Sequence, residues 1–164
     1  MRTPLLTLAL LASAAGVHAQ TSLKLGGWDA TYKTQVDGAS LPASVEKMPP
    51  AQRAKMEAVL REAWKPRTRV HKTCLTKADL QEMAKGPDSD DECKYNKLRK
   101  SANGWEADMK CSDGRTGHAV FEATSAERYS GHIVQQLPAG KGRGTLNVDI
   151  SARWASASCK GYDD

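Results

Sequence analysis

The sequence lacks the motifs of the common catalytic sites, and it lacks a hydrophobic run long enough to cross a membrane. It contains no G-x-S-x-G, no H-E-x-x-H and no C-x-x-C, so hydrolase, zinc-protease and thiol-redox chemistry have no local signature. Its longest apolar run, Leu5–Ala15, has 11 residues, whereas a bilayer core needs about 20. We therefore predict no catalytic residue, no cofactor, no metal and no transmembrane span.

The composition is that of one soluble domain with a mild positive charge. The chain has 164 residues, of which 40% are hydrophobic and 26% charged, and its formal net charge is +5. This charge falls short of the dense basic stripe that marks a nucleic-acid-binding protein. Nucleic acid is therefore not an expected partner.

The first nineteen residues are typical of a secretory signal peptide. A basic start at Met1 and Arg2 precedes the apolar run, and the small-residue sequence Val17-His18-Ala19 stands before Gln20. Cleavage near Ala19-Gln20 would leave residues 20–164 as a single exported domain. We expect a periplasmic or secreted protein.

The four cysteines, Cys74, Cys93, Cys111 and Cys159, all lie in the exported part. An even count in an oxidising compartment predicts two disulfides, with three possible connectivities. We favour Cys93 with Cys111, on neighbouring strands of one hairpin that needs a wide loop or a bulge, and Cys74 with Cys159, which ties the tail to an earlier strand. The rival pairing joins Cys74 to Cys93 around a short helix.

Strict alternation of apolar and polar residues recurs in Trp28–Val36, Trp105–Cys111 and Leu146–Trp154. Such a period of two predicts antiparallel strands with one apolar face. Weaker strands are expected at Arg67–Cys74, Cys93–Lys100, Gly117–Thr124 and Tyr129–Leu137, with turns at Asn103-Gly104 and Ser125–Arg128. The predicted fold is mainly β (α+β), a curved antiparallel meander of about seven strands that forms a partly open barrel or is covered by a helix.

Two helices interrupt the strands. Between Pro49-Pro50 and Pro66, the segment Ala51–Lys65 has an apolar stripe, which consists of Met56, Val59, Leu60, Ala63 and Trp64. A second, short helix follows Thr76, with Asp79 completing its cap and Leu80 and Met83 on its buried side. We interpret both helices as lids on the sheet.

The alternation places five large side chains on inward strand faces: Trp28, Tyr32, Trp105, Met109 and Trp154. They would line a pocket for a small apolar ligand if the sheet forms a cup, or they would fill the core. The sequence leaves both readings open.

The longer helix also has a basic side, formed by Arg53, Lys55 and Arg61. With the apolar stripe packed inward, this side would face solvent and could contact an anionic envelope surface or an acidic partner. The acids Glu57 and Glu62 would neutralise part of it.

Three other features can be interpreted either as chemical sites or as ordinary structural elements. His118 and His132 would approach each other if their strands form a hairpin, as a metal or catalytic pair or as two surface residues. The acidic run Pro87–Glu92 could bind a hard cation or be a solvated loop. The segment Gly140–Gly144 could wrap an anion or be a mobile hairpin loop.

Several short motifs, taken in order, resemble one bacterial family. In chain order they are the signal peptide, Gly26-Gly27-Trp28-Asp29, Cys74-Leu75-Thr76 followed by Asp79-Leu80, Cys93, a hairpin that leads to Trp105 and Cys111, Tyr129-Ser130-Gly131, and a last cysteine near the C-terminus. The chain resembles the family named "domain of unknown function 3617" over nearly all of its exported part. The resemblance implies an exported envelope protein and carries no catalytic residue or ligand.

These observations favour an exported, non-enzymatic binding or accessory module. The first alternative is an envelope interaction module that uses the basic helix side. The second, less favoured alternative is a metal-dependent enzyme built from the two histidines and the acidic run.

Overall fold

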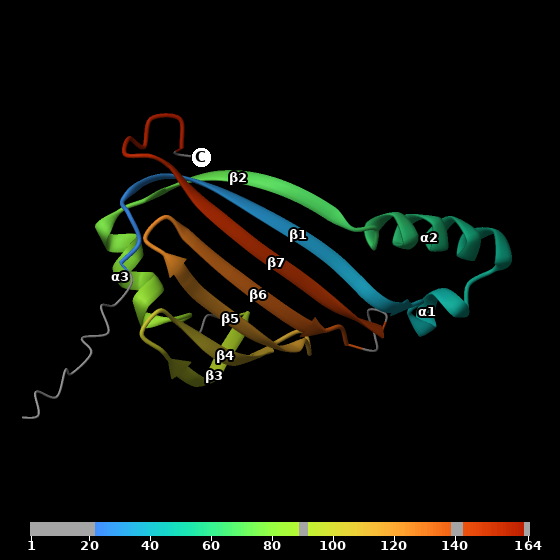
Figure 1. Ribbon diagram of the computed structural model, residues 1–164. Helices are drawn as coiled ribbons and strands as arrows, with labels where there is room; N and C mark the ends of the chain where they lie inside the picture. Colours follow the sequence, from blue (N-terminus) through green and yellow to red (C-terminus); the bar gives the residue numbers. More distant parts are fainter. Residues whose placement is uncertain (1–21, 89–91, 139–142, 163–164) are drawn as a thin grey trace, which may run out of the picture.

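Figure 1 shows a computed structural model of the chain, which describes residues 22–88, 92–138 and 143–162. The predicted signal peptide at residues 1–19 lies outside the described residues. So do residues 89–91 of the acidic run and residues 140–142 of the glycine-rich segment.

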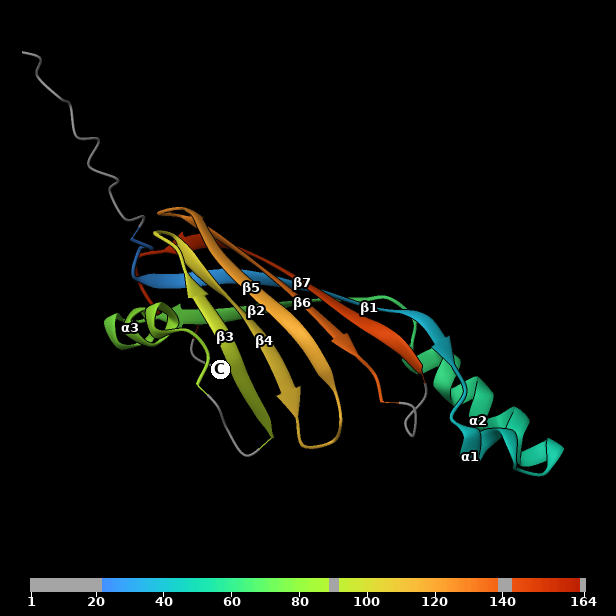
Figure 2. The ribbon, with the colours of Figure 1, turned by 90° about the horizontal axis from the view of Figure 1, so that it is seen from below.

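The described chain forms one open, curved antiparallel sheet of seven strands, in the order β2-β1-β7-β6-β5-β4-β3 (Figures 1 and 2). The strands are β1 (Gly26–Ser40), β2 (Arg67–Leu75), β3 (Cys93–Lys100), β4 (Gly104–Cys111), β5 (Thr116–Ser125), β6 (Arg128–Gln136) and β7 (Arg143–Ser156). All seven coincide with or overlap the strands predicted from alternation. The predicted mainly β class is therefore confirmed.

The meander is continuous from β3 to β7, and β1 with β2 forms a separate hairpin-like pair. The two parts join because β1 pairs with β7, from Gly27 opposite Ser156 to Ser40 opposite Arg143. This pairing leaves β2 and β3 as the two edges of the sheet. The connection between these edges carries α3 (Lys77–Lys85) across one end of the sheet.

The short helix α3 begins as the sequence predicts. The Asp79 backbone N–H donates to Thr76 Oγ1 at 3.3 Å, and the Thr76 backbone N–H donates to the Asp79 carboxylate at 2.7 Å. This reciprocal pair satisfies two amides that the first helical turn leaves without partners. Leu80 and Met83 then pack against the core cluster, so α3 covers one end of the sheet.

The longer helix differs from its prediction. It spans Pro50–Ala63 as α2, and a short helix that was not predicted, α1 (Ala43–Glu46), precedes it. No residue of α2 is buried, and its main packing contact is with α1 rather than with a strand. The interpretation of α2 as a lid, with its stripe packed inward, was therefore wrong, because a period of 3.6 fixes the stripe but not its partner.

The core lies beneath α3, on the sheet face that carries Trp28, which we call the α3 face. Trp28 is 0% exposed, and its indole Nε1–H donates to the Lys24 carbonyl at 3.0 Å. The Tyr129 ring lies 5.3 Å from the Trp28 ring and 5.4 Å from the Phe121 ring. Burial of the phenol raises the pKa of Tyr129 to about 12.

The β3–β4 hairpin contains both features that were predicted as alternatives for the favoured disulfide, a wide loop and a bulge. Residues 101–103 separate the strands, and the register shifts between Asn96 and Arg99, where Lys97 has a φ of 51°. These two irregularities together place Cys93 opposite Cys111. Gly104 permits the tight approach to β5, since a Cβ there would lie 1.9 Å from the Phe121 carbonyl oxygen.

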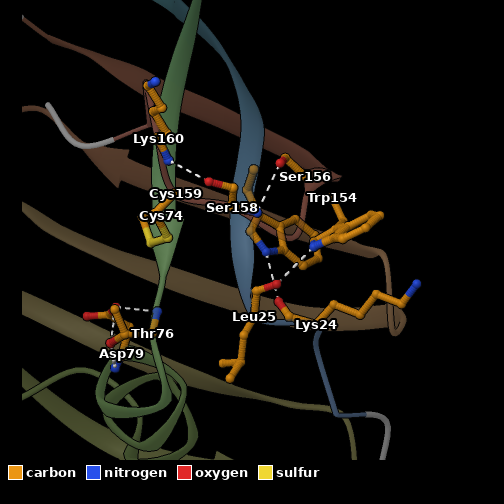
Figure 3. The surroundings of a disulfide bond; sticks show 11 residues. Lys24, Leu25, Cys74, Thr76, Asp79, Trp154, Ser156, Ser158, Cys159 and Lys160 are labelled. Atoms are coloured by element: carbon orange, nitrogen blue, oxygen red, sulfur yellow. Dashed lines mark hydrogen bonds between the residues drawn. A yellow bond between two sulfur atoms is a disulfide. The ribbon is translucent and has the colours of Figure 1, made fainter.

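Both favoured cysteine pairs are formed, Cys93 with Cys111 and Cys74 with Cys159. The second pair ties the C-terminal segment to the end of β2, directly before α3 (Figure 3). Tyr162, three residues further on, packs against Gly27, where a Cβ would come within 2.5 Å of its ring.

Candidate functional site

A cavity of about 380 Å³ lies between α3 and the β3–β5 side of the sheet, and we call it the α3 cavity. Its apolar walls come from the N-terminal segment, from α3 and from β4 and β5. The residues that form these walls are Leu23, Leu80, Met83, Ala84, Trp105, Phe121 and Ala123. Such a lining suits an apolar group, because burying apolar surface is favourable at about 25 cal/mol per Å².

The polar groups of the cavity gather on its β3–β4 side. Ser101 and Asn103, in the hairpin loop, line it together with Lys100, and Ser22 lines it from the N-terminal segment. The loop is held in place because the Ala123 amide donates to the Asn103 carbonyl at 2.7 Å and the Ser101 amide donates to the Gly104 carbonyl at 2.8 Å. A small number of polar groups beside apolar walls is the usual composition of a small-molecule pocket.

The helix that walls this cavity is held at both ends. Cys74 lies two residues before the Thr76 cap and is bonded to Cys159 beyond β7. Cys93 begins β3 after α3 and is bonded to Cys111 at the end of β4. The disulfides therefore fix one end of the segment between residues 74 and 93 to the C-terminal segment and the other end to β4.

The five residues predicted to line a pocket or fill the core divide between these roles. Trp105 lines the α3 cavity, and its ring stacks on that of Phe121 at a centroid distance of 6.1 Å. Trp28 and Met109 are buried. Tyr32 lines a different cavity, and Trp154 packs at the edge of the core, so the five residues do not form one pocket.

Trp154 instead helps to hold the N-terminal segment on the sheet. Its indole Nε1–H donates to the Leu25 carbonyl at 3.0 Å, and Lys24 Nζ lies 4.5 Å from its ring centroid (Figure 3). Lys24 also pairs with Glu127, and its backbone amide donates to the Ala126 carbonyl at 2.8 Å. These contacts place Leu23 against the core, as a wall of the cavity.

Sequence analysis missed Leu23, Ala84 and Phe121 as wall residues. Leu23 lies outside any periodic segment, and Phe121 belongs to a strand whose alternation is weak. Leu80 and Met83 were predicted as the buried side of α3, but their position beside a cavity was not. Predicting these wall residues would have required the strand order, which places β5 beneath α3.

A second cavity, of about 340 Å³, lies along β1 and β2 near the end of α2. Tyr32, Thr34 and Val36 of β1 line it, and Ala63 and Lys65 line it from the end of α2 and the turn that follows. Alternate residues of β2, Arg67, Arg69 and His71, give it a basic wall. The His71 ring meets the Tyr32 ring edge-on, with the centroids 5.1 Å apart.

The two candidate histidines each have a separate carboxylate partner. The distance from His118 Nδ1 to Asp108 Oδ1 is 3.0 Å, and that from His132 Nδ1 to Asp149 Oδ1 is 2.7 Å. His118 lies opposite Val134 rather than opposite His132. Both histidines occupy the strand face opposite Phe121, because side chains alternate along a strand, so neither lies in the α3 cavity.

Asp108 is the most strongly connected of these carboxylates. Hydrogen bonds from His118 and then from Lys97 lower the pKa of Asp108 below its usual value. Within the described part of the chain, no group of three or more His, Cys, Asp or Glu side chains is placed to hold a metal ion. The acidic run is only partly described, and its central residues lie outside that part.

The predicted partner face on α2 is exposed. Arg53 and Arg61 lie 3.6 Å and 3.8 Å from opposite oxygens of the same carboxylate, Glu57. Pairs at this exposure contribute little to stability, about 0.3–0.5 kcal/mol each. None of the described helices is long and apolar enough to serve as a membrane span.

Comparison with known proteins gives one match. A family model described as "Protein of unknown function (DUF3617)" matches residues 23–159. The match covers most of the chain and confirms the resemblance found from the motifs. No curated protein and no solved structure matches.

Proposed function

Since the chain belongs to the DUF3617 family of proteins of unknown function, we propose its function from the site: it is an exported, non-enzymatic module that binds a small apolar ligand in the α3 cavity. The observation that supports this proposal is the cavity itself, which has a volume of about 380 Å³ and combines apolar walls with a polar side at the β3–β4 loop. Pockets for small ligands in proteins have about 300–1,000 Å³. The volume therefore suits a ligand at the small end of this range.

The lining supports a ligand with an apolar body and one polar end. Lys100 lies on the hairpin side together with Ser101 and Asn103, so the polar end would meet a cation and two hydrogen-bonding side chains there. A ligand with its polar end toward this loop would keep its hydrogen bonds while its body is removed from water.

Export is supported by the predicted signal peptide and by the two cysteine pairs. Disulfides persist in oxidising compartments such as the periplasm. In this proposal they hold the cavity wall in place outside the cell, where no reducing system would open them.

The non-enzymatic part of the proposal rests on where the reactive side chains lie. The two His–Asp pairs are on the face of the sheet opposite the cavity, where the His132–Asp149 pair is exposed to solvent and the His118–Asp108 pair is half-buried. Catalytic pairs work in sites that exclude water and hold a substrate beside them. The described walls of the cavity contain Ser22 and Ser101 but no histidine that could activate them.

The test uses the full chain after export and N-phenyl-1-naphthylamine, a neutral fluorescent probe. We expect the fluorescence of the probe to rise to saturation as the protein binds it. In Ala84→Trp, which fills the cavity from α3, the affinity for the probe should fall by at least about tenfold. The matched control is Ala78→Trp, an exposed position on the same helix that does not line the cavity. Native mass spectrometry of the protein from the periplasm would identify a co-purifying ligand.

Equal loss of probe binding in Ala78→Trp and Ala84→Trp would contradict the proposal, because it would place the probe elsewhere. Turnover of a substrate that stops on mutation of His118 or His132 would contradict its non-enzymatic part. Circular dichroism of each variant shows that the sheet is intact.

A further inference from the structure

Helix α2 extends beyond the end of the sheet opposite α3 (Figures 1 and 2). None of its 14 residues is buried, and its main contact is the short helix α1. A helix of this length gains little stability in isolation. The apolar stripe of α2 therefore contributes little to the stability of the fold and remains accessible to a partner.

Part of the stripe is exposed. Val59 is 62% exposed and Met56 is 38% exposed, so α2 holds two of the five exposed large hydrophobic side chains in the described part of the chain. Ala63 is also exposed, and Leu60 and Trp64 are half-buried. Exposed apolar side chains that gather on one face mark an interaction site.

Positive charge is concentrated on the same arm of the molecule. Residues 47–66, which we call the α2 arm, hold five basic residues and two acidic residues. The basic residues of the α2 arm are Lys47, Arg53, Lys55, Arg61 and Lys65, and Arg67 and Arg69 continue the positive charge onto the adjoining end of β2.

The cations border the apolar stripe. At 100° per residue, Lys55 falls about 40° from Val59 and Arg53 about 60° from Met56, on the two sides of the exposed part of the stripe, whereas Arg61 falls on the far side of the helix. Lys55 has no hydrogen bond or ion pair with any described residue, whereas Arg53 and Arg61 share Glu57. The opposite side of α2 is formed mainly by small residues, such as Ala51, Ala54 and Ala58.

We propose that the α2 arm docks on the surface of an anionic phospholipid bilayer, with α2 lying in the plane of the interface. In this orientation Met56, Val59 and Ala63 enter the boundary between headgroups and acyl chains. Lys55 and Arg53 extend their aliphatic stems along that boundary and place their charges at the phosphates. The inference does not rest on the proposed ligand site, which lies at the other end of the sheet.

The shape of the arm favours a bilayer over an acidic protein. A flat surface can reach the stripe because α2 projects beyond the strands. A stripe bordered by cations on both sides matches a uniform anionic plane, and each basic residue near such a surface contributes about 1 kcal/mol of attraction.

The experiment measures binding of the exported full-length protein to vesicles of phosphatidylglycerol and phosphatidylethanolamine, with phosphatidylcholine vesicles as the neutral comparison. We expect binding only to the anionic vesicles, and weaker binding as salt rises. Replacing Arg53, Lys55 and Arg61 together by Gln should weaken binding by roughly 100-fold. Val59→Asp alone should weaken it by at least about tenfold.

A matched charge control replaces Lys94, Lys110 and Lys160 by Gln, three exposed lysines outside the arm. This control should change binding by less than about threefold, since a docked surface depends on local charge rather than on net charge. Equal effects of the two triple variants, or equal binding to neutral vesicles, would overturn the proposal.

Charge-dependent capture of an acidic protein together with no binding to anionic vesicles would also overturn it, in favour of a protein partner. Circular dichroism and thermal unfolding of each variant serve as the readout of folding. A loss of vesicle binding with an unchanged unfolding transition locates the effect in the arm, and failure of the ligand proposal leaves this test unchanged because the readout does not use the α3 cavity.

Discussion

Cys74 and Cys93 stand at the two ends of the segment that carries α3, yet Cys74 is bonded to Cys159 in the C-terminal segment and Cys93 to Cys111 at the end of β4. A Cys74–Cys93 bond would only have closed a loop around the helix. The observed pairs instead fasten the crossing from edge strand β2 to edge strand β3 at both of its ends. The wall of the α3 cavity therefore depends on both bonds.

Removal of each disulfide should reduce stability by different amounts. The bonds span 85 and 18 residues, so chain entropy predicts that replacing Cys74 and Cys159 by Ser lowers the free energy of unfolding by about 4.5 kcal/mol. The same change at Cys93 and Cys111 should lower it by about 3 kcal/mol. Denaturant unfolding measures both values, and a non-reducing peptide map that recovered Cys74 linked to Cys93 would contradict the pairing.

Substitution of tryptophan should destabilise the protein much more in the core than at the end of α2. Trp28→Ala removes a fully buried side chain and leaves the Lys24 carbonyl without its indole partner. We expect a loss of about 4 kcal/mol in the free energy of unfolding. Trp64→Ala at the end of α2 should cost less than about 1 kcal/mol. Thermal unfolding separates the two, and equal costs would show that α2 packs on the core in solution.

The α3 cap should give the protein part of its sensitivity to acid. The hydrogen bond from the Thr76 side chain, followed by that from the Thr76 backbone, lowers the pKa of Asp79 below its usual 3.8. The cap thus stabilises the fold fully above the unfolded pKa, and this contribution disappears as pH falls through the lower folded pKa. In Asp79→Asn the slope of unfolding free energy against pH below pH 4 should be shallower. An unchanged slope would argue against the cap.

The Tyr129 phenol should ionise late. Burial in the core raises its pKa to about 12, so the stabilisation that its neutral form gives is complete below pH 10 and is lost as pH rises through about 12. A spectrophotometric titration of the folded protein should show a tyrosine ionisation step near pH 12. Tyr129→Phe should remove this step, and persistence of the step would assign it to a different tyrosine.

Much of the strand pattern was available from local sequence. Alternation located β1, β4 and β7, and Thr76 with Asp79 located the start of α3. Even the need for a bulge or a wide loop between Cys93 and Cys111 followed from counting residues across the hairpin. These features depend on side chains a few positions apart, which a single sequence displays.

The apolar stripe of α2 shows where local pattern ends. The spacing of Met56, Val59 and Leu60 correctly predicted a helix, but the expectation that the stripe faces the sheet was wrong. Periodicity shows which side chains share a face of the helix, but it does not show what that face packs against. The same spacing of apolar residues is found in exposed and in buried stripes.

The sequence by itself determined the strands, the α3 cap and the family, because alternation, capping and ordered motifs are local or linear properties of the chain. Only the tertiary structure decided that β1 pairs with β7, that α3 crosses between the two edge strands and leaves a cavity beneath it, and that α2 extends away from the sheet. Those outcomes depend on contacts between distant segments, some of which are more than one hundred residues apart in the sequence. The packing energy that favours one arrangement over another arises only when these segments come into contact.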